Sequence, residues 1–226
     1  MYHVCWRCGA FAADKEILPD PAYPEGGHGL AICPACGHAH PFRRWPLLIV
    51  GGASGSGKTT LLHRMLQERS ARRGPAALLL EADILWQPAL DTPQDNYRAF
   101  CQSWVRLALN LGQQGPPVVL FGAGLGVPDN LEGIPEVRWF TGVHILSLVC
   151  DDEVLAGRLR ERPAWRGTRE EPFIAAQLRF NAWNRAQRAL PDPPLTLLDT
   201  TDATPEDAAA AAWRWLERAL QVSPGG

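Results

Sequence analysis

Residues 51–60 read GGASGSGKTT and directly follow the apolar run PLLIV. From Gly52 onward they match the pattern G-x-x-x-x-G-K-[ST] at every fixed position. Glycines let backbone N–H groups come close to an anion, and the start of a following helix adds partial positive charge. Such a loop holds the phosphates of a nucleotide, so we expect Lys58 to reach the β- and γ-phosphates and Thr59 to bind Mg²⁺ through its hydroxyl. The segment that we call the phosphate loop comprises Gly52, Ala53, Ser54, Gly55, Ser56, Gly57, Lys58, Thr59 and Thr60.

Four of the six cysteines form two C-x-x-C pairs, each followed by a glycine: Cys5, Cys8, Cys33 and Cys36. Two such turns supply four thiolates, which suit tetrahedral Zn²⁺, and four sulfur ligands leave no open position for catalysis. The pattern resembles a zinc ribbon over residues 1–42, so we expect a structural zinc module at residues 1–45. The alternative is four unrelated thiols. Because four sulfurs are available, we expect the nearby histidines to be surface residues and not ligands: His3, His28, His38 and His40.

The composition limits the classes of protein that the chain can represent. It has 226 residues, of which 46% are hydrophobic and 20% charged, with a net charge of −2 and a pI of about 6.3. A sizeable core can form, whereas long nucleic acid usually requires a basic surface. The N-terminus lacks the basic and apolar regions of a signal peptide, and no apolar run approaches membrane-spanning length. We therefore expect a cytoplasmic protein without a membrane partner.

Beyond residue 46, short apolar runs alternate with helical patterns, which predicts an α/β domain over residues 46–226. The expected strands are 47–50, 76–80, 117–121, 142–150 and 195–200. The expected helices follow the phosphate loop and then span 94–112, 151–162, 170–190 and 205–222. Continuously apolar strands alternating with helices predict a parallel five-stranded sheet covered on both faces. We expect Thr168 to cap the helix at 170–190, with Glu171 as its capping-box partner.

Two further groups could take part in chemistry beside the phosphate loop. Asp83, and less clearly Glu81, follow the second strand, where a carboxylate can accept a proton or orient Mg²⁺. A turn or helix-capping role is the alternative for Asp83. Arg158 and Arg162 share a helix face, and Arg166 follows them in a loop that could close over phosphates. A solvated charged face is the alternative for these arginines.

From residue 47 to residue 220 the chain resembles a P-loop kinase of the nucleoside and nucleotide kinase type. The matching pieces are GASGSGKTT, EAD after the second strand, VCDDEVLAGRLRER before the arginine loop, and LDTT after the fifth strand. The resemblance implies the strand order 2-3-1-4-5. It also implies that Arg162 and Arg166 contact ATP phosphates. The residues that it places beside the adenine are Asp199, Thr200 and Thr201. Gly122 departs from the pattern, because it follows the third strand where a carboxylate often supports Mg²⁺.

The resemblance indicates an ATP-dependent kinase that transfers the γ-phosphoryl group to a nucleoside or nucleoside monophosphate. The expected cofactors are ATP, Mg²⁺ and Zn²⁺, and the expected partner is a small nucleoside-type acceptor gripped near Trp86 and Tyr97. Tyr97, Phe100 and Trp104 recur at a spacing that suits a core-facing helix at least as well. Two alternatives remain open: a kinase for polynucleotide 5′-hydroxyl ends, and a regulatory ATPase that binds nucleic acid or protein. The sequence contains no indication of the oligomeric state.

Overall fold

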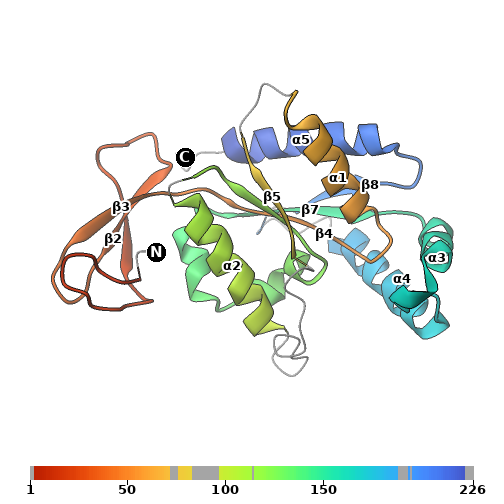
Figure 1. The fold of residues 1–226 in the computed structure, drawn as a ribbon, viewed down its shortest axis with the longest axis horizontal. Coiled ribbons are helices and arrows are strands. Elements are labelled where there is room, and N and C mark those ends of the chain that lie inside the picture. The colour runs from red at the N-terminus through yellow and green to blue at the C-terminus, as the bar shows by residue number, and fades with distance from the viewer. Residues whose placement is uncertain are drawn as a thin grey trace.

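The structure is a computed structural model that describes residues 3–71, 76–82, 97–113, 115–187, 193 and 195–221. Two sheets of different kinds make up the fold. A small antiparallel sheet lies at one end of the molecule, and a five-stranded parallel sheet with its helices forms the rest (Figure 1).

The larger sheet has the strand order β5-β6-β4-β7-β8. Its strands are β4 (Leu47–Gly52), β5 (Leu78–Glu81), β6 (Val118–Phe121), β7 (Val143–Val149) and β8 (Leu195–Asp199). Every neighbouring pair is parallel. Counted along the α/β part, this is the order 2-3-1-4-5, so the expected parallel five-stranded sheet and its strand order are both confirmed.

The apolar strands are buried on both faces of the sheet. All six residues of β4 are buried, and their side chains alternate between two cores. Leu48 and Val50 join the core formed with helices α1 (Lys58–Glu68) and α5 (Pro205–Gln221), whereas Leu47 and Ile49 join the core formed with α2 (Arg98–Gly112). This two-sided burial explains why β4 is continuously apolar and does not alternate with polar residues.

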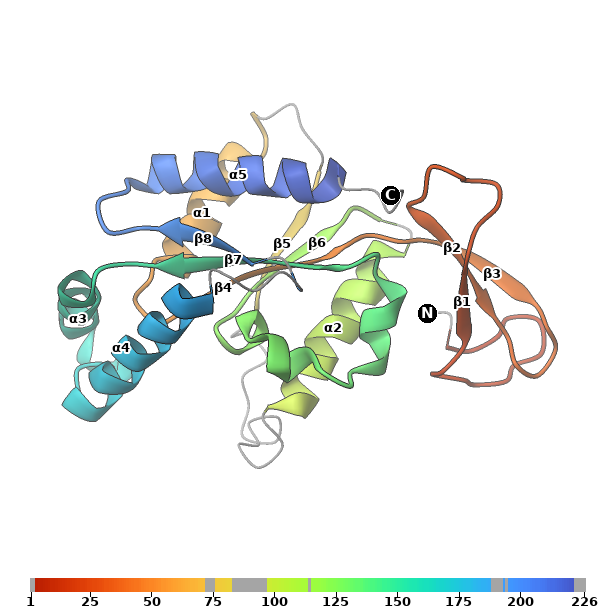
Figure 2. The same ribbon diagram turned by 180° about the vertical axis from the view of Figure 1, so that it is seen from behind.

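Helices cover both faces of the sheet, as the two opposite ribbon views show (Figures 1 and 2). The helices are α1 (Lys58–Glu68), α2 (Arg98–Gly112), α3 (Asp152–Glu161), α4 (Glu171–Ala186) and α5 (Pro205–Gln221). Helices α1 and α5 pack together on one face, and α2 and α4 lie on the other. Short 3-10 helices lie at η3 (Gly124–Gly126), η4 (Pro128–Leu131), η5 (Pro135–Trp139) and η6 (Ala164–Arg166).

The capping role expected for Thr168 is wrong. The residue before α4 is Glu170, and no side chain caps the helix there. Thr168 is buried, and its Oγ1 donates to the carbonyl of Leu159, 3.2 Å away. The hydroxyl of Thr168 therefore bonds to α3 and does not cap α4. If it capped α4, the buried carbonyl of Leu159 would lose this donor.

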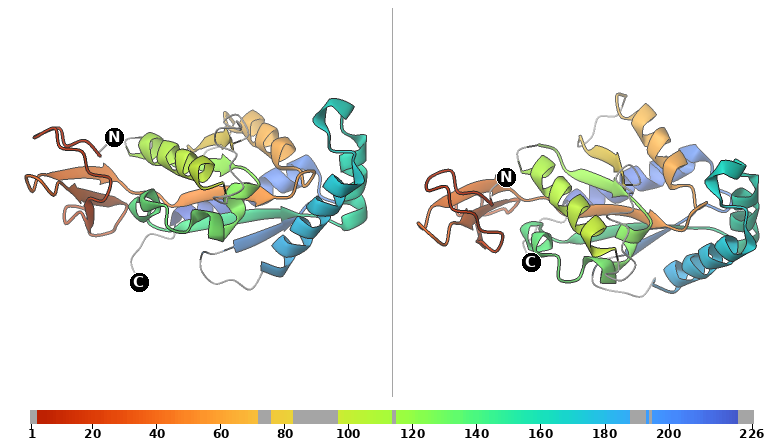
Figure 3. Two further views of the ribbon diagram at one scale, coloured as in Figure 1. Left: turned by 90° about the horizontal axis from the view of Figure 1, so that it is seen from below. Right: turned by 60° about the horizontal axis from the view of Figure 1, so that its bottom comes forward.

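The small sheet pairs β1 (Glu16–Pro19), β2 (His28–Ile32) and β3 (Ala39–Arg43) in sequence order. Both pairings are antiparallel. The sheet projects from the end of the larger domain where β4 begins (Figure 3). Arg44 stabilises the junction between the small sheet and the larger domain. Its Nη2 donates to the carbonyl of Phe140 at 2.8 Å, and its Nε donates to the carbonyl of Trp139 at 3.4 Å.

Within the described ranges, no helix is both long and apolar enough to cross a bilayer.

Candidate active site and metal centre

A cleft of about 750 Å³ opens at the edge of the larger sheet where its parallel strands end. The phosphate loop, the end of β5, the η6 turn and the segment after β8 all line it. The lining residues with polar or aromatic side chains are Ser54, Lys58, Thr59, Thr60, Glu81, Arg158, Arg162, Trp165, Arg166, Thr200 and Thr204. The cleft therefore brings together the phosphate loop, both predicted flap arginines and Thr200.

The phosphate loop takes its shape from glycines in backbone conformations that other residues rarely adopt. Gly52, Gly55 and Gly57 have φ angles of 125°, 89° and 101°. A Cβ on Gly52 would lie 2.4 Å from the carbonyl oxygen of Leu148, so this position also requires the absence of a side chain. Gly52, Ala53 and Ser56 are buried beneath the cleft. Gly57 immediately precedes α1, so the N-terminus of that helix faces the cleft.

The side chain of Lys58 folds back onto the start of the phosphate loop. Its Nζ donates to the carbonyl oxygens of Gly52 at 2.7 Å and Ala53 at 3.0 Å. The ammonium group is thus held at the cleft by two backbone oxygens, within the loop that is expected to surround phosphates.

Thr59 has a carboxylate partner that the sequence left undecided. Its Oγ1 donates to Glu81 Oε1 at 2.9 Å. A hydroxyl and a carboxylate oxygen are the ligand types that Mg²⁺ prefers, so this pair fits the metal expected here. Asp83, the carboxylate that the sequence favoured, lies outside the described residues.

Gly122 follows β6, the strand between β4 and β5, and no carboxylate fits at its position. A Cβ there would lie 2.8 Å from the Cβ of Ala82 and 3.3 Å from a methyl group of Leu125. A carboxylate at position 122 would therefore clash with its neighbours. Glu81, on the neighbouring strand β5, supplies a carboxylate to Thr59 instead.

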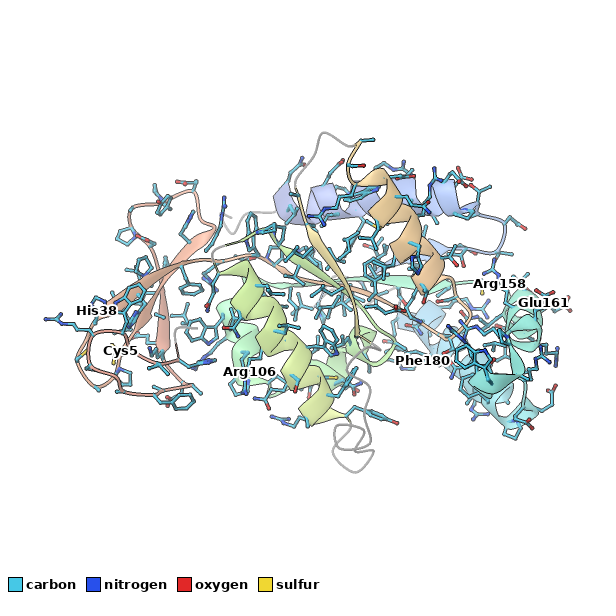
Figure 4. The ribbon with its side chains drawn as sticks, viewed as in Figure 1. Cys5, His38, Arg106, Arg158, Glu161 and Phe180 are labelled. Carbon is cyan, nitrogen blue, oxygen red and sulfur yellow. The ribbon has the colours of Figure 1, made fainter. Side chains whose placement is uncertain are left out.

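The arginines around the cleft divide into two kinds. Arg158, which is labelled in Figure 4, stabilises the segment after β8, because its Nη2 donates to the carbonyl of Thr200 at 2.8 Å. Arg162 and Arg166 both line the cleft, and the guanidinium of Arg166 lies 5.1 Å from the centre of the exposed Trp165 ring. Arg162 ends α3 and Arg166 is the last residue of η6, and both line the cleft together with the phosphate loop.

The segment after β8 meets the phosphate loop through Thr200. Its Oγ1 donates to the carbonyl of Ser56 at 2.9 Å, and the residue is buried. Asp199 does not line the cleft; its Oδ1 accepts from Oγ1 and N of Thr201 at 2.6 and 2.8 Å. These bonds from Thr201 lower the pKa of the Asp199 carboxyl. Thr200 thus lies at the cleft beside the phosphate loop, whereas Asp199 shapes the turn next to it.

The four cysteine sulfurs gather at one point of the small sheet. All four Sγ atoms lie within 4.8 Å of one another, and the pairs Cys5–Cys36 and Cys8–Cys33 are 3.8 Å apart. A zinc–sulfur bond of about 2.3 Å puts tetrahedral sulfurs about 3.8 Å apart, so the arrangement fits zinc. The glycines that close the two turns have the positive φ angles that such turns require.

The electrostatics of the thiols agree with a cation at this centre. Burial acts to raise the pKa of Cys5, but backbone hydrogen bonds at Cys8 and Arg7 and a bond from His40 lower that pKa to about 5. A backbone bond at Ala10 acts to lower the pKa of Cys8, whereas its contacts with Cys36 and the other sulfurs raise that pKa to about 11. Burial also acts to raise the pKa of Cys33, but backbone hydrogen bonds at Ala35 and Cys36 lower that pKa. A cation bound among the sulfurs would favour the thiolate form of every cysteine, including Cys8.

The surface positions expected for His3 and His40 are wrong, because both residues are buried. His40 is fully buried beside the four cysteines, and its Nε2 lies 3.3 Å from Cys5 Sγ. The two-residue period of β3 was the available signal, because His40 shares the inward face with Phe42 whereas Pro41 and Arg43 are exposed.

The residues expected to grip an acceptor are mostly part of the core. Phe100 and Trp104 are buried on α2, and Tyr97 packs against the same cluster. Trp86 lies outside the described residues. Nothing described on α2 therefore forms the aromatic surface that was considered for the acceptor.

The comparisons with known proteins concern the fold. No protein-family model matches the sequence, and a search among curated proteins finds no match. Among solved structures, a sugar kinase from Janibacter sp. HTCC2649 is similar, with a TM-score of 0.58 and 21% identity over 80% of this chain and 99% of that chain. The larger part of the chain has the fold of a P-loop kinase.

Two other solved structures agree with this fold. Kti12 from Chaetomium thermophilum, in complex with ADP-AlF3, has a TM-score of 0.51 and 19% identity, covering 75% of this chain and 98% of that chain. The tunicamycin resistance protein of Deinococcus radiodurans has a TM-score of 0.51 and 15% identity, covering 80% of this chain and all of that chain. At these identities the likeness concerns the P-loop kinase fold and leaves the acceptor undetermined.

Proposed function

We propose that the protein is an ATP-dependent kinase that transfers the γ-phosphoryl group of ATP to a small acceptor. The observation that carries this proposal is the convergence of Lys58, the Thr59–Glu81 pair and the flap arginines on one cleft. The cleft volume of about 750 Å³ lies within the range of small-molecule sites. The P-loop kinase fold supports the same class of reaction.

In this mechanism the phosphate loop and Lys58 neutralise charge on the β- and γ-phosphates. The transition state of phosphoryl transfer is largely dissociative, so positioning and charge neutralisation supply most of the catalysis. Lys58 supplies its positive charge from a position fixed by the carbonyls of Gly52 and Ala53. Backbone N–H groups around Gly57 and the N-terminus of α1 add partial positive charge.

Thr59 and Glu81 would hold Mg²⁺, which when bound offsets negative charge on the phosphates. The Glu81 carboxylate holds the Thr59 hydroxyl in place, and it ends the strand beside which an acceptor would enter. Asp83 follows Glu81 by two residues and remains our proposed base for an acceptor hydroxyl. Exchange of each carboxylate by its amide separates the two roles.

Arg162 and Arg166 would close over the transferring phosphoryl group from the η6 turn. Both line the same cleft as the phosphate loop, and both keep their charge at any working pH. A flap that brings arginines onto a phosphate also excludes water, which suppresses hydrolysis. Thr200 lies beside the loop and borders the end of the cleft proposed for the base of ATP.

Our proposed acceptor is a nucleoside or nucleoside monophosphate. The P-loop kinase fold and a cleft of small-molecule size support a small acceptor. A sugar is the second candidate, because the similar structure from Janibacter is described as a sugar kinase. The zinc module is proposed as a structural part, since four sulfur ligands leave no open coordination position.

A side-by-side acceptor assay with Mg²⁺ and radiolabelled ATP tests the proposal. The panel contains nucleosides, nucleoside monophosphates, sugars and 5′-hydroxyl oligonucleotides, each with the unaltered protein and with Lys58→Ala. Arg69→Ala is the matched control, because it removes an exposed positive charge just after α1. We expect transfer to a small acceptor that Lys58→Ala lowers by on the order of 10³-fold and that Arg69→Ala leaves unchanged.

Two results would count against the proposal. Slow ATP hydrolysis that no acceptor accelerates would favour a regulatory ATPase. Phosphorylation of the oligonucleotide alone, abolished by raised salt, would favour a polynucleotide 5′-hydroxyl kinase.

A further inference from the structure

Helix α4 carries a line of three amide side chains on the face that it turns towards β7 and the phosphate loop. Gln177, Asn181 and Asn184 are spaced four and three residues apart, so they share one side of the helix. Asn184 Oδ1 accepts from Ser147 Oγ at 2.7 Å, and Asn181 Nδ2 donates to the carbonyl of Cys150 at 2.7 Å. Both asparagines are buried and bonded, so they fix α4 against β7.

The third member of this line contacts the phosphate loop itself. Gln177 Oε1 accepts from the backbone N–H of Ser54 at 2.8 Å. The same peptide unit carries the carbonyl of Ala53, which accepts from Lys58 Nζ at 3.0 Å. One peptide group therefore lies between Gln177 and Lys58 and is bonded to both.

The geometry of a trans peptide makes this connection directional. Its N–H and C=O point to opposite sides, so an acceptor that fixes the N–H also fixes where the carbonyl points. Bonds on the two sides of one peptide group also polarise and strengthen each other. Rotation of the 53–54 peptide would turn its carbonyl away from Lys58 and remove one of the two oxygens that hold the ammonium group.

We propose that Gln177 is a positioning residue for Lys58, acting through the Ala53–Ser54 peptide. The inference rests on the proposed function in that Lys58 is taken to contact the β- and γ-phosphates. Gln177 sets the direction of the carbonyl that holds the Lys58 ammonium, and Asn181 and Asn184 set the position of Gln177. Phosphates that depend on Lys58 are consequently bound less well when Gln177 cannot accept a hydrogen bond.

A double-mutant cycle tests whether Gln177 acts through Lys58. Gln177→Met conserves volume and removes the acceptor, whereas Gln177→Asn keeps the amide but withdraws it by one methylene. Arg179→Ala is the matched control, since Arg179 lies on the same helix with an exposed side chain. Affinities for ADP and a non-hydrolysable ATP analogue are measured by calorimetry in the parent and Lys58→Ala backgrounds, with kcat and KM for the best acceptor.

We expect Gln177→Met and Gln177→Asn to weaken binding of the ATP analogue by about tenfold, the value of one ordinary hydrogen bond. The loss for ADP is smaller, because Lys58 meets fewer of its phosphate oxygens, and kcat falls more than KM rises. In the Lys58→Ala background the same substitutions change neither affinity, and Arg179→Ala changes nothing in either background.

Additive losses in the two backgrounds would overturn the inference, because they would mean that Gln177 supports the fold independently of Lys58. Equal losses for ADP and the ATP analogue would overturn it as well. An unaltered protein that binds neither nucleotide would overturn the proposed function along with it, whereas normal nucleotide binding by Gln177→Met would overturn the positioning role alone.

Discussion

Gly52 is the position where a single added methyl group should damage the candidate site most. It ends β4, pairs with Leu148 of β7, and has a φ angle of 125°. In Gly52→Ala the new Cβ would lie 2.4 Å from the backbone oxygen of Leu148 and 2.8 Å from Ser56 Oγ. The hydroxyl of Ser56 can rotate away, but the carbonyl belongs to the centre of the sheet and cannot.

The size of the effect follows from these distances. Relief of the contact with Leu148 requires a displacement of about 1 Å, since ordinary van der Waals contact begins near 3.4 Å. Because Gly52 opens the phosphate loop, the displacement passes into the loop, and a misplacement of this size costs on the order of 10²-fold in rate. The strained φ adds about 1–3 kcal/mol to the cost of folding. That loss lowers Tm by roughly 2–4 °C for each kcal/mol in a domain of this size.

Gly142→Ala is the matched control for Gly52→Ala. Gly142 also adjoins β7, yet a Cβ added to it would meet no atom within 4 Å, and its φ angle is not positive. We expect Gly142→Ala to keep ATP affinity, turnover and Tm, and Gly52→Ala to lose affinity and turnover while the circular dichroism spectrum stays that of a folded protein. If Gly52→Ala retained turnover within about threefold and the parent Tm, the close approach of the loop to β7 would not matter for function.

Three further predictions concern the phosphate loop, the metal centre and the junction between the sheets. Lys58→Ala should lower turnover by on the order of 10³-fold in the acceptor assay, and turnover within about threefold of the parent would exclude the loop as the phosphate site. Metal analysis should find about one zinc per chain, which is lost in Cys36→Ser and kept in Cys101→Ser. If the parent protein contained no zinc and four freely titrating thiols, the zinc site would be excluded. Burial acts to raise the pKa of Glu136, but hydrogen bonds from Arg106 and Gln102 lower it below its usual 4.5. The ionised carboxylate therefore stabilises the folded state above pH 4.5, and this stabilisation is lost as the pH falls through the lowered pKa. Glu136→Gln should therefore lower Tm near pH 7 and have little effect near pH 3, and an equal loss at both pH values would refute the role of its charge.

The larger sheet could be predicted because its evidence is local to each strand. Runs such as LLIV and VVLF admit little besides buried strands, and the pattern of the phosphate loop requires a strand before it and a helix after it. Positions of single polar side chains were less predictable. Thr168 has the residue type of a helix cap, but tertiary packing gives its hydroxyl to Leu159.

Glu81 and Gln177 show why the site was only partly readable from the sequence. Glu81 ends a strand two places away from β4 in the sheet, and its bond to Thr59 depends on how far α1 lies over β5. Gln177 lies more than a hundred residues after Ser54, on a helix whose apolar pattern gives no reason to single it out. Motif spacing specifies contacts within one loop, whereas these contacts are specified by the packing of separate elements.

The positions of the two metal-related centres bear on the choice between a small acceptor and a polynucleotide. The small sheet adjoins the start of β4, whereas the phosphate loop follows its end, and Cys5 and Arg158 lie at opposite ends of the molecule (Figure 4). The strand β4, which lies between them, is six residues or about 20 Å long. A nucleic-acid strand held at the zinc module would have to cross that distance to present its 5′ end at the cleft. The net charge of the protein is −2, which does not favour binding of a polyanion along the way.

The zinc module makes its contacts with the larger domain at η5. There His3 packs edge-on against Trp139, and Arg138 donates to the carbonyl of Ala13. These contacts attach the zinc module to the part of the domain that carries η5, as the proposed structural role of the zinc requires.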